Sequence, residues 1–437
     1  MAVAEEPHPG YELLLNKPYL TYDFDEETFV RLWDIWPEPD RSQAEQLSPR
    51  DRRQLIFKRY GLTPRPGADL DSETTPPLQY VVDASGKWTM NCFTCHGGSV
   101  MGKVVPGAPN TRFALQSLSE DLWKLKTQLM PEKPLTRMER AQHLVPLGTT
   151  RGTTNAVMFG VGLLALRDGE LNMRPVLIPP RMVHHDLDAP AWWVFHKKTH
   201  LYAEGYAPKG HRSLMQFALI RSNGPEKFRE WEPDFQEIAA YLDSLRPPRY
   251  PLPIDQPLAR RGAVLFAQNC AECHGTYGDQ SEFPSRVIPL SEIGTDPVRF
   301  TAIRQEEREL FHQSWFGHHG EAGTVTRRDG YLAPPLDGIW ASAPYFHNGS
   351  VPTLWHLLHP AERPRVWRQT DPDQYDERRG GMLVEELDRV PADVASVQER
   401  REFFDTAQFG KSSAGHLFPD VLSEEEKQAV LEYLKTL

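Results

Sequence analysis

Every cysteine of this chain belongs to one of two Cys-x-x-Cys-His motifs. The residues of the motifs are Cys92, Cys95 and His96, and Cys270, Cys273 and His274. Two thiols at this spacing can form thioethers to one haem, and the histidine that follows can bind its iron. Disulfides or a four-cysteine zinc site would need no histidine after each cysteine pair. The motifs therefore predict two covalently bound haem c groups, with His96 and His274 as proximal iron ligands.

The composition is that of a soluble globular protein, because 39% of the 437 residues are hydrophobic and 25% are charged. This length allows two or three domains. The net charge of −11 argues against nucleic acid or an anionic membrane as partner, since both favour a basic face. No apolar run reaches the ~18–20 residues that a membrane span requires.

Haem is attached to such motifs outside the cytoplasm, so we expect a periplasmic or secreted protein. The first residues, Met-Ala-Val-Ala-Glu-Glu, lack the basic and apolar regions of a signal peptide. We therefore expect that the native signal peptide is absent from this sequence and that Met1 is not a native residue.

Two amphipathic segments, each far downstream of a motif, predict closing helices. Glu232–Leu245 and Ser423–Leu437 both carry apolar residues at helical spacing, and they end alike, in Tyr-Leu-Asp-Ser-Leu and Tyr-Leu-Lys-Thr-Leu. A further helix is predicted from Pro257 into the second motif. Helix, motif, long loops and closing helix is the order of elements in a cytochrome c domain.

We therefore predict a mainly α fold with long irregular loops, made of two cytochrome c-type haem domains and an N-terminal arm. The arm spans residues 1–75, the first domain 76–248 and the second domain 255–437. Arg246–Pro257 has five prolines in twelve residues, which predicts a stiff extended linker. The arm is expected to wrap around the domains, with a helix over Asp25–Trp36 that faces the core.

The sixth ligand of each iron decides between electron transfer and reaction with small oxidants. After residue 255 the sequence has one methionine, Met382, in a stretch that resembles a surface turn, so a histidine is the expected distal ligand of the second haem. The histidine candidates there are His312, His318, His319, His347, His356, His359 and His416. His416 is preferred because it lies in a Gly/Ser loop just before the closing helix, and His347 is the alternative.

The first haem has several candidate distal groups, most of them in the stretch 181–202. They are His184, His185, His196, His200, Met101, Met158 and Met182. The stretch is either a loop whose aromatic residues pack into the core or a distal pocket. In a pocket, a histidine would act as acid–base group or switchable ligand, and Trp192, Trp193 or Tyr202 would relay electrons.

The segment Leu332–Leu354 contains Pro-Tyr-Phe-His-Asn-Gly-Ser and resembles the signature of the bacterial di-haem cytochrome c peroxidase superfamily. This block and the later Ser-Ala-Gly-His-Leu-Phe are most similar to the rubber-oxygenase-like branch. The resemblance covers residues 80–437 and is looser in the first half. It implies that His274 holds an electron-transfer haem and that His96 holds the haem that reacts with substrate.

The resemblance also bears on the distal residues. Peroxidases have a methionine, and the enzyme that matures tryptophan tryptophylquinone has a tyrosine, fourteen residues after the signature histidine. That position is Ala361 here, which favours His416 as distal ligand and implies that His347 lies next to the ligands instead of binding iron. The Trp-Asp-Gly segment of the family corresponds to Tyr202–Gly205, and the matches for its catalytic glutamate are Glu204 and Glu226.

Together these features predict a di-haem c-type cytochrome oxidoreductase. Its first haem would react with hydrogen peroxide or dioxygen, as in a peroxidase or oxygenase, and its second would transfer or store electrons. The candidate catalytic residues are His185, Trp192, Tyr202 and Glu204. The expected partners are the small oxidant, an organic substrate and a periplasmic electron donor or acceptor protein, and Ca²⁺ is a further candidate cofactor. The alternative is a pure electron carrier with two six-coordinate haems.

Overall fold

The computed structural model describes residues 7–69, 71–136, 139–140, 145–175, 181–278, 281–317 and 329–437. Helices are the main regular structure, and the described strands have only two to four residues each. Long irregular segments join these elements, most clearly over 181–191 and 406–417. The expected predominance of helices and irregular loops is therefore confirmed for the described part of the chain.

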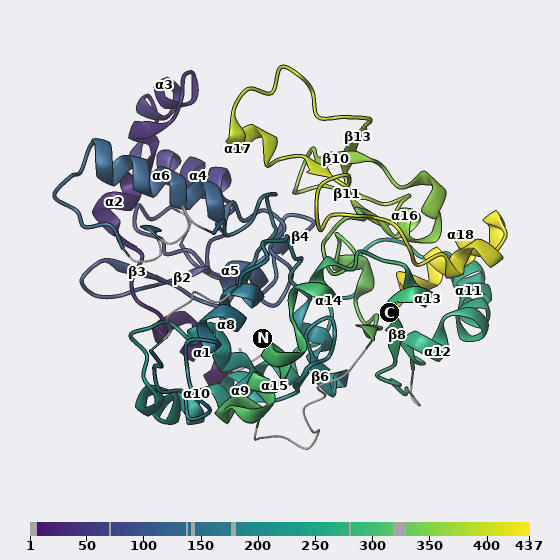
Figure 1. Ribbon diagram of the computed structural model, residues 1–437. Coiled ribbons are helices and arrows are strands. Elements are labelled where there is room, and N and C mark those ends of the chain that lie inside the picture. Colours follow the sequence, from purple (N-terminus) through teal and green to yellow (C-terminus); the bar gives the residue numbers. More distant parts are fainter. Residues whose placement is uncertain are drawn as a thin grey trace, which may run out of the picture.

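Two helices enclose the second motif in the sequence and pack against each other in the structure (Figure 1). They are α11 (Gln256–Asn269) and α18 (Glu424–Leu434). Asp255 caps α11, and Ser423 forms a capping box with Glu426 at the start of α18. At their crossing, a Cβ atom on Gly262 would lie 1.9 Å from the carbonyl oxygen of Ala429, so only glycine fits there.

The first half contains a helix pair with the same contacts. Helix α1 (Pro9–Asn16) packs on α10 (Pro225–Ser244), which includes the predicted closing helix and begins seven residues earlier. A Cβ atom on Gly10 would lie 2.3 Å from the carbonyl oxygen of Glu237 and 2.8 Å from Cβ of Tyr241. Gly262 approaches Ala429 and Tyr433 in the same way. The two predicted closing helices, which end alike in sequence, thus also pack alike in the structure.

Helix α1 lies within the predicted arm, residues 1–75, and packs on α10 of the predicted first domain. The remainder of the arm packs with residues 80–90 and 115–128 as a layer beside the first motif, which we call the arm layer. Strand β3 (Lys87–Met90) pairs with β1 (Phe24–Asp25) and β2 (Tyr80–Val82), and α4 (Pro49–Tyr60) packs on α6 (Leu115–Gln128).

The predicted helix over Asp25–Trp36 is two short elements. Helix α2 spans Glu26–Val30, and a 3₁₀ turn follows over Leu32–Ile35. The break lies at Arg31, whose N–H bonds to the carbonyl oxygen of Thr28 in place of a continued α-helical bond. The predicted apolar face is nevertheless correct, because Phe29, Leu32 and Trp36 are all buried.

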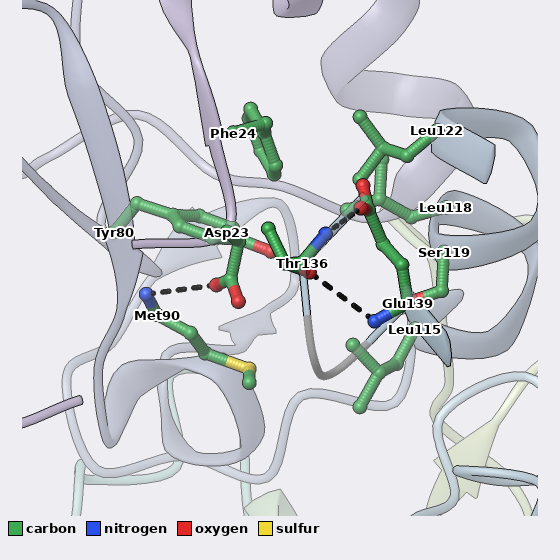
Figure 2. A pocket seen from close by; sticks show the side chains of 10 residues that line it. All are labelled: Asp23, Phe24, Tyr80, Met90, Leu115, Leu118, Ser119, Leu122, Thr136 and Glu139. Carbon is green, nitrogen blue, oxygen red and sulfur yellow. Dashed lines mark hydrogen bonds between the residues drawn. The ribbon is translucent and has the colours of Figure 1, made fainter. Parts of the chain in front are cut away.

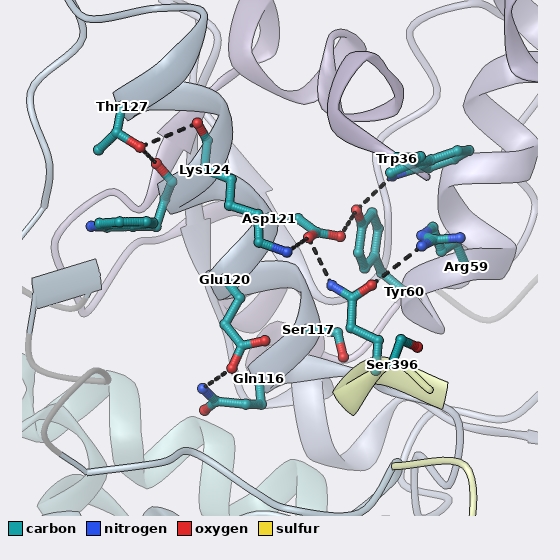
Figure 3. Close-up of polar contacts among 12 residues, drawn as sticks. Trp36, Arg59, Tyr60, Gln116, Ser117, Glu120, Asp121, Lys124, Thr127 and Ser396 are labelled. Carbon is teal, nitrogen blue, oxygen red and sulfur yellow. Dashed lines mark hydrogen bonds and ion pairs between the residues drawn. The ribbon is translucent and has the colours of Figure 1, made fainter. Parts of the chain in front are cut away.

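A polar network joins the arm layer to the C-terminal half (Figure 3). The hydroxyl group of Tyr60 donates to Asp121 at 2.8 Å and accepts from the indole N–H of Trp36 at 2.9 Å. Gln398, in α17 (Val397–Arg400), donates to the other oxygen of Asp121 at 2.7 Å. The C-terminal half therefore contacts the arm as well as its own helices.

A small cavity lies between the three-stranded sheet and α6 (Figure 2). Asp23, Tyr80 and Glu139 are among its lining residues, and none of those residues belongs to either motif. Its volume of about 10 Å³ leaves room for about one water molecule. Burial raises the pKa of Asp23 to about 7, and Glu139 is paired with buried Lys126 at 2.7 Å. Nothing about this cavity suggests a cofactor site.

Two details of the second half differ from expectation. Met382, predicted on a surface turn, is buried in β12 (Gly381–Met382) against Trp367 and Phe404. The linker has no helix between Ser244 and Gln256, as predicted. It is not a free spacer, however, because the carbonyl oxygen of Pro248 accepts the indole N–H of Trp340 at 3.1 Å.

Candidate haem-binding sites

Each Cys-x-x-Cys-His motif forms one short helical turn. Helix α5 (Phe93–His96) carries the first motif and α12 (Ala271–His274) the second. All four cysteines are free thiols and only partly exposed. Cysteines three residues apart in a helical turn lie on one face, so both thiols of a motif can reach the same haem.

The same hydrogen bond orients both proximal histidines. Nδ1 of His96 lies 3.0 Å from the carbonyl oxygen of Pro190, and Nδ1 of His274 lies 2.9 Å from that of Pro334. A carbonyl can only accept, so Nδ1 carries the hydrogen and Nε2 keeps a free lone pair. Histidines that bind metals usually donate their other ring N–H in this way. Burial lowers the pKa of His96 to about 4, which keeps this ring neutral. Both histidines thus fit a haem iron.

A second histidine ring faces His274. The ring centres of His274 and His416 lie 6.3 Å apart, with their planes at 58°. An iron held between two imidazoles, with metal–nitrogen bonds of about 2 Å on each side, places the ring centres about 6 Å apart. The assignment of His416 as distal ligand stays a prediction, and the observed spacing is the one that it requires.

The backbone around His416 is held in an unusual conformation. Gly415 and His416 both have positive φ, +80° and +50°. Such a conformation is uncommon for a residue other than glycine and persists only where the surroundings hold it. The N–H of His416 donates to the carbonyl oxygen of Ile293 at 2.6 Å, and a Cβ on Gly415 would lie 2.2 Å from the carbonyl carbon of Gly294. The loop is therefore fixed tightly where it presents the ring.

The other histidines of the second half have different surroundings. His356 pairs with Thr353 at 2.7 Å, and His359 pairs with Glu424 at 2.8 Å. His312 is exposed on α15 (Gln305–Gln313), and His318 and His319 lie outside the described residues. His347, the alternative ligand, lies against Tyr331 with ring centres 4.3 Å apart.

Trp192 lies beside the first proximal histidine. Its ring stacks on that of His96 at 4.7 Å and 25°, at the start of the 3₁₀ helix Trp192–Lys197. In the structure this ring packs against the proximal histidine, and the assignment of Trp192 to a distal pocket stays a prediction. The neighbouring Trp193 donates its indole N–H to the carbonyl oxygen of Asp337 at 2.9 Å.

The histidines near Trp192 each have a hydrogen-bond partner at Nδ1, as His96 and His274 do. Nδ1 of His185 lies 3.0 Å from the carbonyl oxygen of Val183, and Nδ1 of His196 lies 2.8 Å from that of Trp193. His184 pairs with Asn155, and His200 with Thr199. Of the methionine candidates, Met158 is fully buried in the apolar core and Met182 lies against Gly162. Met101 is half-buried against the apolar cluster that contains Trp193 and Trp340. Within the described residues, no histidine ring faces His96 as the ring of His416 faces His274.

The remaining predicted residues lie at the boundary of the two halves or on the surface. The Tyr202 hydroxyl donates to the carbonyl oxygen of Ser213 at 2.9 Å. Glu204 forms a buried two-pronged ion pair with Arg299, with both contacts at 3.0 Å, so an acid–base role would first require this pair to break. Glu226 is exposed in the first turn of α10, and its assignment as a catalytic glutamate stays a prediction.

Sequence reasoning missed several residues that position these groups. The carbonyls of Pro190 and Pro334 carry no side-chain signal, and Arg299 lies in a short helix, α14 (Val298–Ala302), without a motif. Lys411 forms a buried ion pair with Asp186 across the two halves at 3.0 Å. Only contacts between distant segments identify them.

Comparisons with known proteins agree with the haem motifs. A family model described as RoxA-like, cytochrome c-like matches residues 330–368. This stretch includes Pro334 and His347 but neither motif. Two uncharacterized proteins of Sinorhizobium fredii are similar. One, y4iM, is 33% identical over 41% of this chain and 45% of its own length, and y4iJ is 31% identical over 44% and 41%. The chain thus spans less than half the length of these relatives.

Two further observations concern membranes and metals. Within the part of the chain that the structure describes, no helix has both the length and the apolar character of a membrane span. The same residues contain no cluster of three or more histidine, cysteine or acidic side chains suited to a metal ion, and Ca²⁺ stays a prediction. The family match supports a relationship with RoxA-like cytochromes c, and it suggests a c-type cytochrome oxidoreductase that binds haem covalently.

Proposed function

We propose that this chain is a periplasmic di-haem oxidoreductase, with an open haem at the first motif and a six-coordinate haem at the second. When bound, haem would supply one-electron chemistry at both motifs and reaction with hydrogen peroxide or dioxygen at the first. Cys92, Cys95 and His96 would hold one group. Cys270, Cys273, His274 and His416 would hold the other.

The observation that carries this proposal is the asymmetry between the motifs. His274 has a second histidine at the spacing of a bound iron, 6.3 Å between ring centres. The ring of His96 instead lies against Trp192, and no second histidine ring faces it within the described residues. A haem with one protein ligand can react with small oxidants, and a haem with two is suited to electron transfer.

The residues between the motifs support electron transfer from one to the other. Trp192 contacts His96, and Trp193 bonds to the backbone at Asp337, three residues after the proline that orients His274. The hydroxyl of Tyr277 accepts from the N–H of Leu336 at 2.6 Å and donates to the carbonyl of His274 at 3.1 Å. We infer that these residues connect the two proximal sides, with an exchangeable redox protein as electron partner.

His185 is the proposed proton-transfer group. It is buried, and burial lowers its pKa to about 4, so the ring is neutral at neutral pH. Its Nε2 has no hydrogen-bond partner among the described residues. Replacement by alanine should lower turnover with peroxide or dioxygen without changing haem content, and unchanged turnover would remove His185 from the mechanism.

Electron paramagnetic resonance of the ferric holoprotein tests the proposal, with haem content measured alongside. We expect two haems per chain, one high-spin signal and one low-spin signal. His416→Ala should convert the low-spin signal to high-spin, whereas the control His359→Ala should leave it unchanged. Two low-spin signals in the wild type would instead support the alternative, a pure electron carrier. A single haem per chain would refute both.

A further inference from the structure

The loop that carries His416 depends on other elements for its position. It has no regular structure from Lys411 to His416, and its Gly/Ser-rich sequence favours flexibility. Two kinds of contact with the second half hold it. Asp296 and the carbonyl of Ile293 accept from the N–H groups of Ser412 and His416, and three side chains, Ser350, Asn348 and Arg363, donate to its carbonyl oxygens. Arg363 donates to the carbonyl oxygens of Ser413 and Gly415, both at 2.7 Å, and Asn348 donates to that of Ser412 at 3.0 Å.

A third anchor reaches into the first half of the chain. Nζ of Lys411 lies 3.0 Å from Oδ2 of Asp186 and donates to the hydroxyl oxygen of Thr150 at 2.5 Å. The side chains of Lys411 and Asp186 are 3% and 0% exposed. Asp186 also accepts from the N–H and the hydroxyl of Thr149, both at 2.8 Å. Both charges of the pair are therefore fully satisfied inside the protein.

Burial of such a pair is not explained by stability alone. Removing two charges from water is costly, and an apolar pair of similar volume is often at least as stable, so a retained buried pair is better understood as a device that fixes one arrangement. Here the arrangement is that of a flexible loop whose far end, five residues on, faces His274. The residue in the first half, Asp186, is four residues from Pro190, which orients His96.

We propose that Lys411 is a positioning residue for His416, and that its ion pair with Asp186 keeps the imidazole on the iron of the second haem. This inference rests on the proposed function, because it assumes that His416 is the distal ligand. It assigns to the first half of the chain a direct influence on the coordination of the second haem.

The test is a double variant, Lys411→Met with Asp186→Asn, which removes the ion pair without leaving an unpaired buried charge. The matched control is Lys435→Met with Glu432→Gln. That pair is also buried in the second half, with N···O 2.7 Å, but does not contact the loop. Both holoproteins are examined for haem content, circular dichroism and low-temperature electron paramagnetic resonance.

We expect the Lys411 double variant to keep two haems and its fold but to lose at least half of the low-spin signal of the second haem. Added free imidazole should restore that signal, as it would for an iron that has lost one ligand. The control should keep the wild-type signal. Full low-spin intensity in the Lys411 double variant, or an equal loss in the control, would overturn the inference. If the wild type itself lacks a bis-imidazole signal, the proposed function has failed first.

Discussion

Replacement of Gly262 by alanine tests whether the close crossing of α11 and α18 holds the second motif in place. A Cβ atom at residue 262 would lie 1.9 Å from the carbonyl oxygen of Ala429 and 2.8 Å from Cβ of Tyr433. Ordinary contacts of a Cβ atom begin at 3.4 Å. The helices must therefore separate by more than about 1 Å, which a well-packed interior resists.

Two effects of opposite sign set the magnitude for Gly262→Ala. Alanine favours a helix over glycine by about 1 kcal/mol. Overpacking costs about 1–3 kcal/mol, and the upper end applies because the obstacle is a backbone carbonyl that cannot rotate away. We expect a net destabilisation of about 2 kcal/mol, or a fall of about 5 °C in the thermal midpoint of the domain.

The assay for Gly262→Ala is thermal unfolding of the holoprotein, followed by circular dichroism and by haem absorption. Gly160→Ala is the control, since its Cβ would meet its nearest neighbour at 3.5 Å and should cause no loss of stability. Gly10→Ala, with a Cβ 2.3 Å from the carbonyl oxygen of Glu237, should behave like Gly262→Ala. A Gly262→Ala protein as stable as the wild type would refute the reasoning.

Two further predictions concern buried charge. Glu204→Gln leaves Arg299 unpaired where both side chains are at most 2% exposed, so unfolding in urea should show a loss of about 3–5 kcal/mol. Glu38→Gln, at an ion pair with Arg41 that is 50% exposed on both sides, should leave the free energy of unfolding nearly unchanged, and equal losses in the two variants would contradict the argument. Burial lowers the pKa of His185 from 6.5 to about 4, so the unfolded chain takes up a proton that the folded chain excludes. This contribution is fully present above pH 6.5 and is lost as pH falls toward 4, by up to about 3 kcal/mol. His185→Gln should flatten the decline in urea midpoint over that range, and an unchanged decline would exclude this cause.

Local patterns in the sequence were sufficient for the helices that flank the second motif. Helices α11, α18 and most of α10 follow from apolar residues at helical spacing and, for α18, from the serine cap. Such signals lie within one segment and depend little on the remainder of the chain. Helix α1 was missed because its apolar face has meaning only against α10, more than 200 residues later.

The residues of the candidate site likewise divide into those that the sequence predicts and those that it does not. The motifs and their proximal histidines follow from sequence because the chemistry itself fixes their spacing. His416 was favoured among seven histidines by its loop and by the family resemblance, since all share the same ring and donor atoms. The contact of Trp192 with His96, and the pairing of Glu204 with Arg299, depend on how distant segments meet. Sequence patterns of one chain contain no signal for such contacts.

The insertion between α1 and the first motif explains how two similar units can look so different in sequence. In the second half, α11 ends at Asn269, directly before Cys270. In the first half, α1 ends at Asn16, 75 residues before Asn91 and the first motif. Yet both asparagines precede a motif, and both donate to a leucine carbonyl, that of α1 for Asn91 and that of α11 itself for Asn269. Asn91 bonds to Leu14 at 3.0 Å, and Asn269 bonds to Leu265 at 2.8 Å.

The insertion therefore begins and ends at nearly the same place. The cost in entropy of closing a long loop grows only slowly with its length, so an inserted layer of this size need not weaken the helix pair beneath it. The contact that must be kept is the one where the inserted segment begins and ends, and the bond from Asn91 to Leu14 is that contact. The arm layer with its sheet and its small cavity is thus best understood as an addition to the first unit. The proximal histidines lie on α5 and α12, which are elements that both halves share.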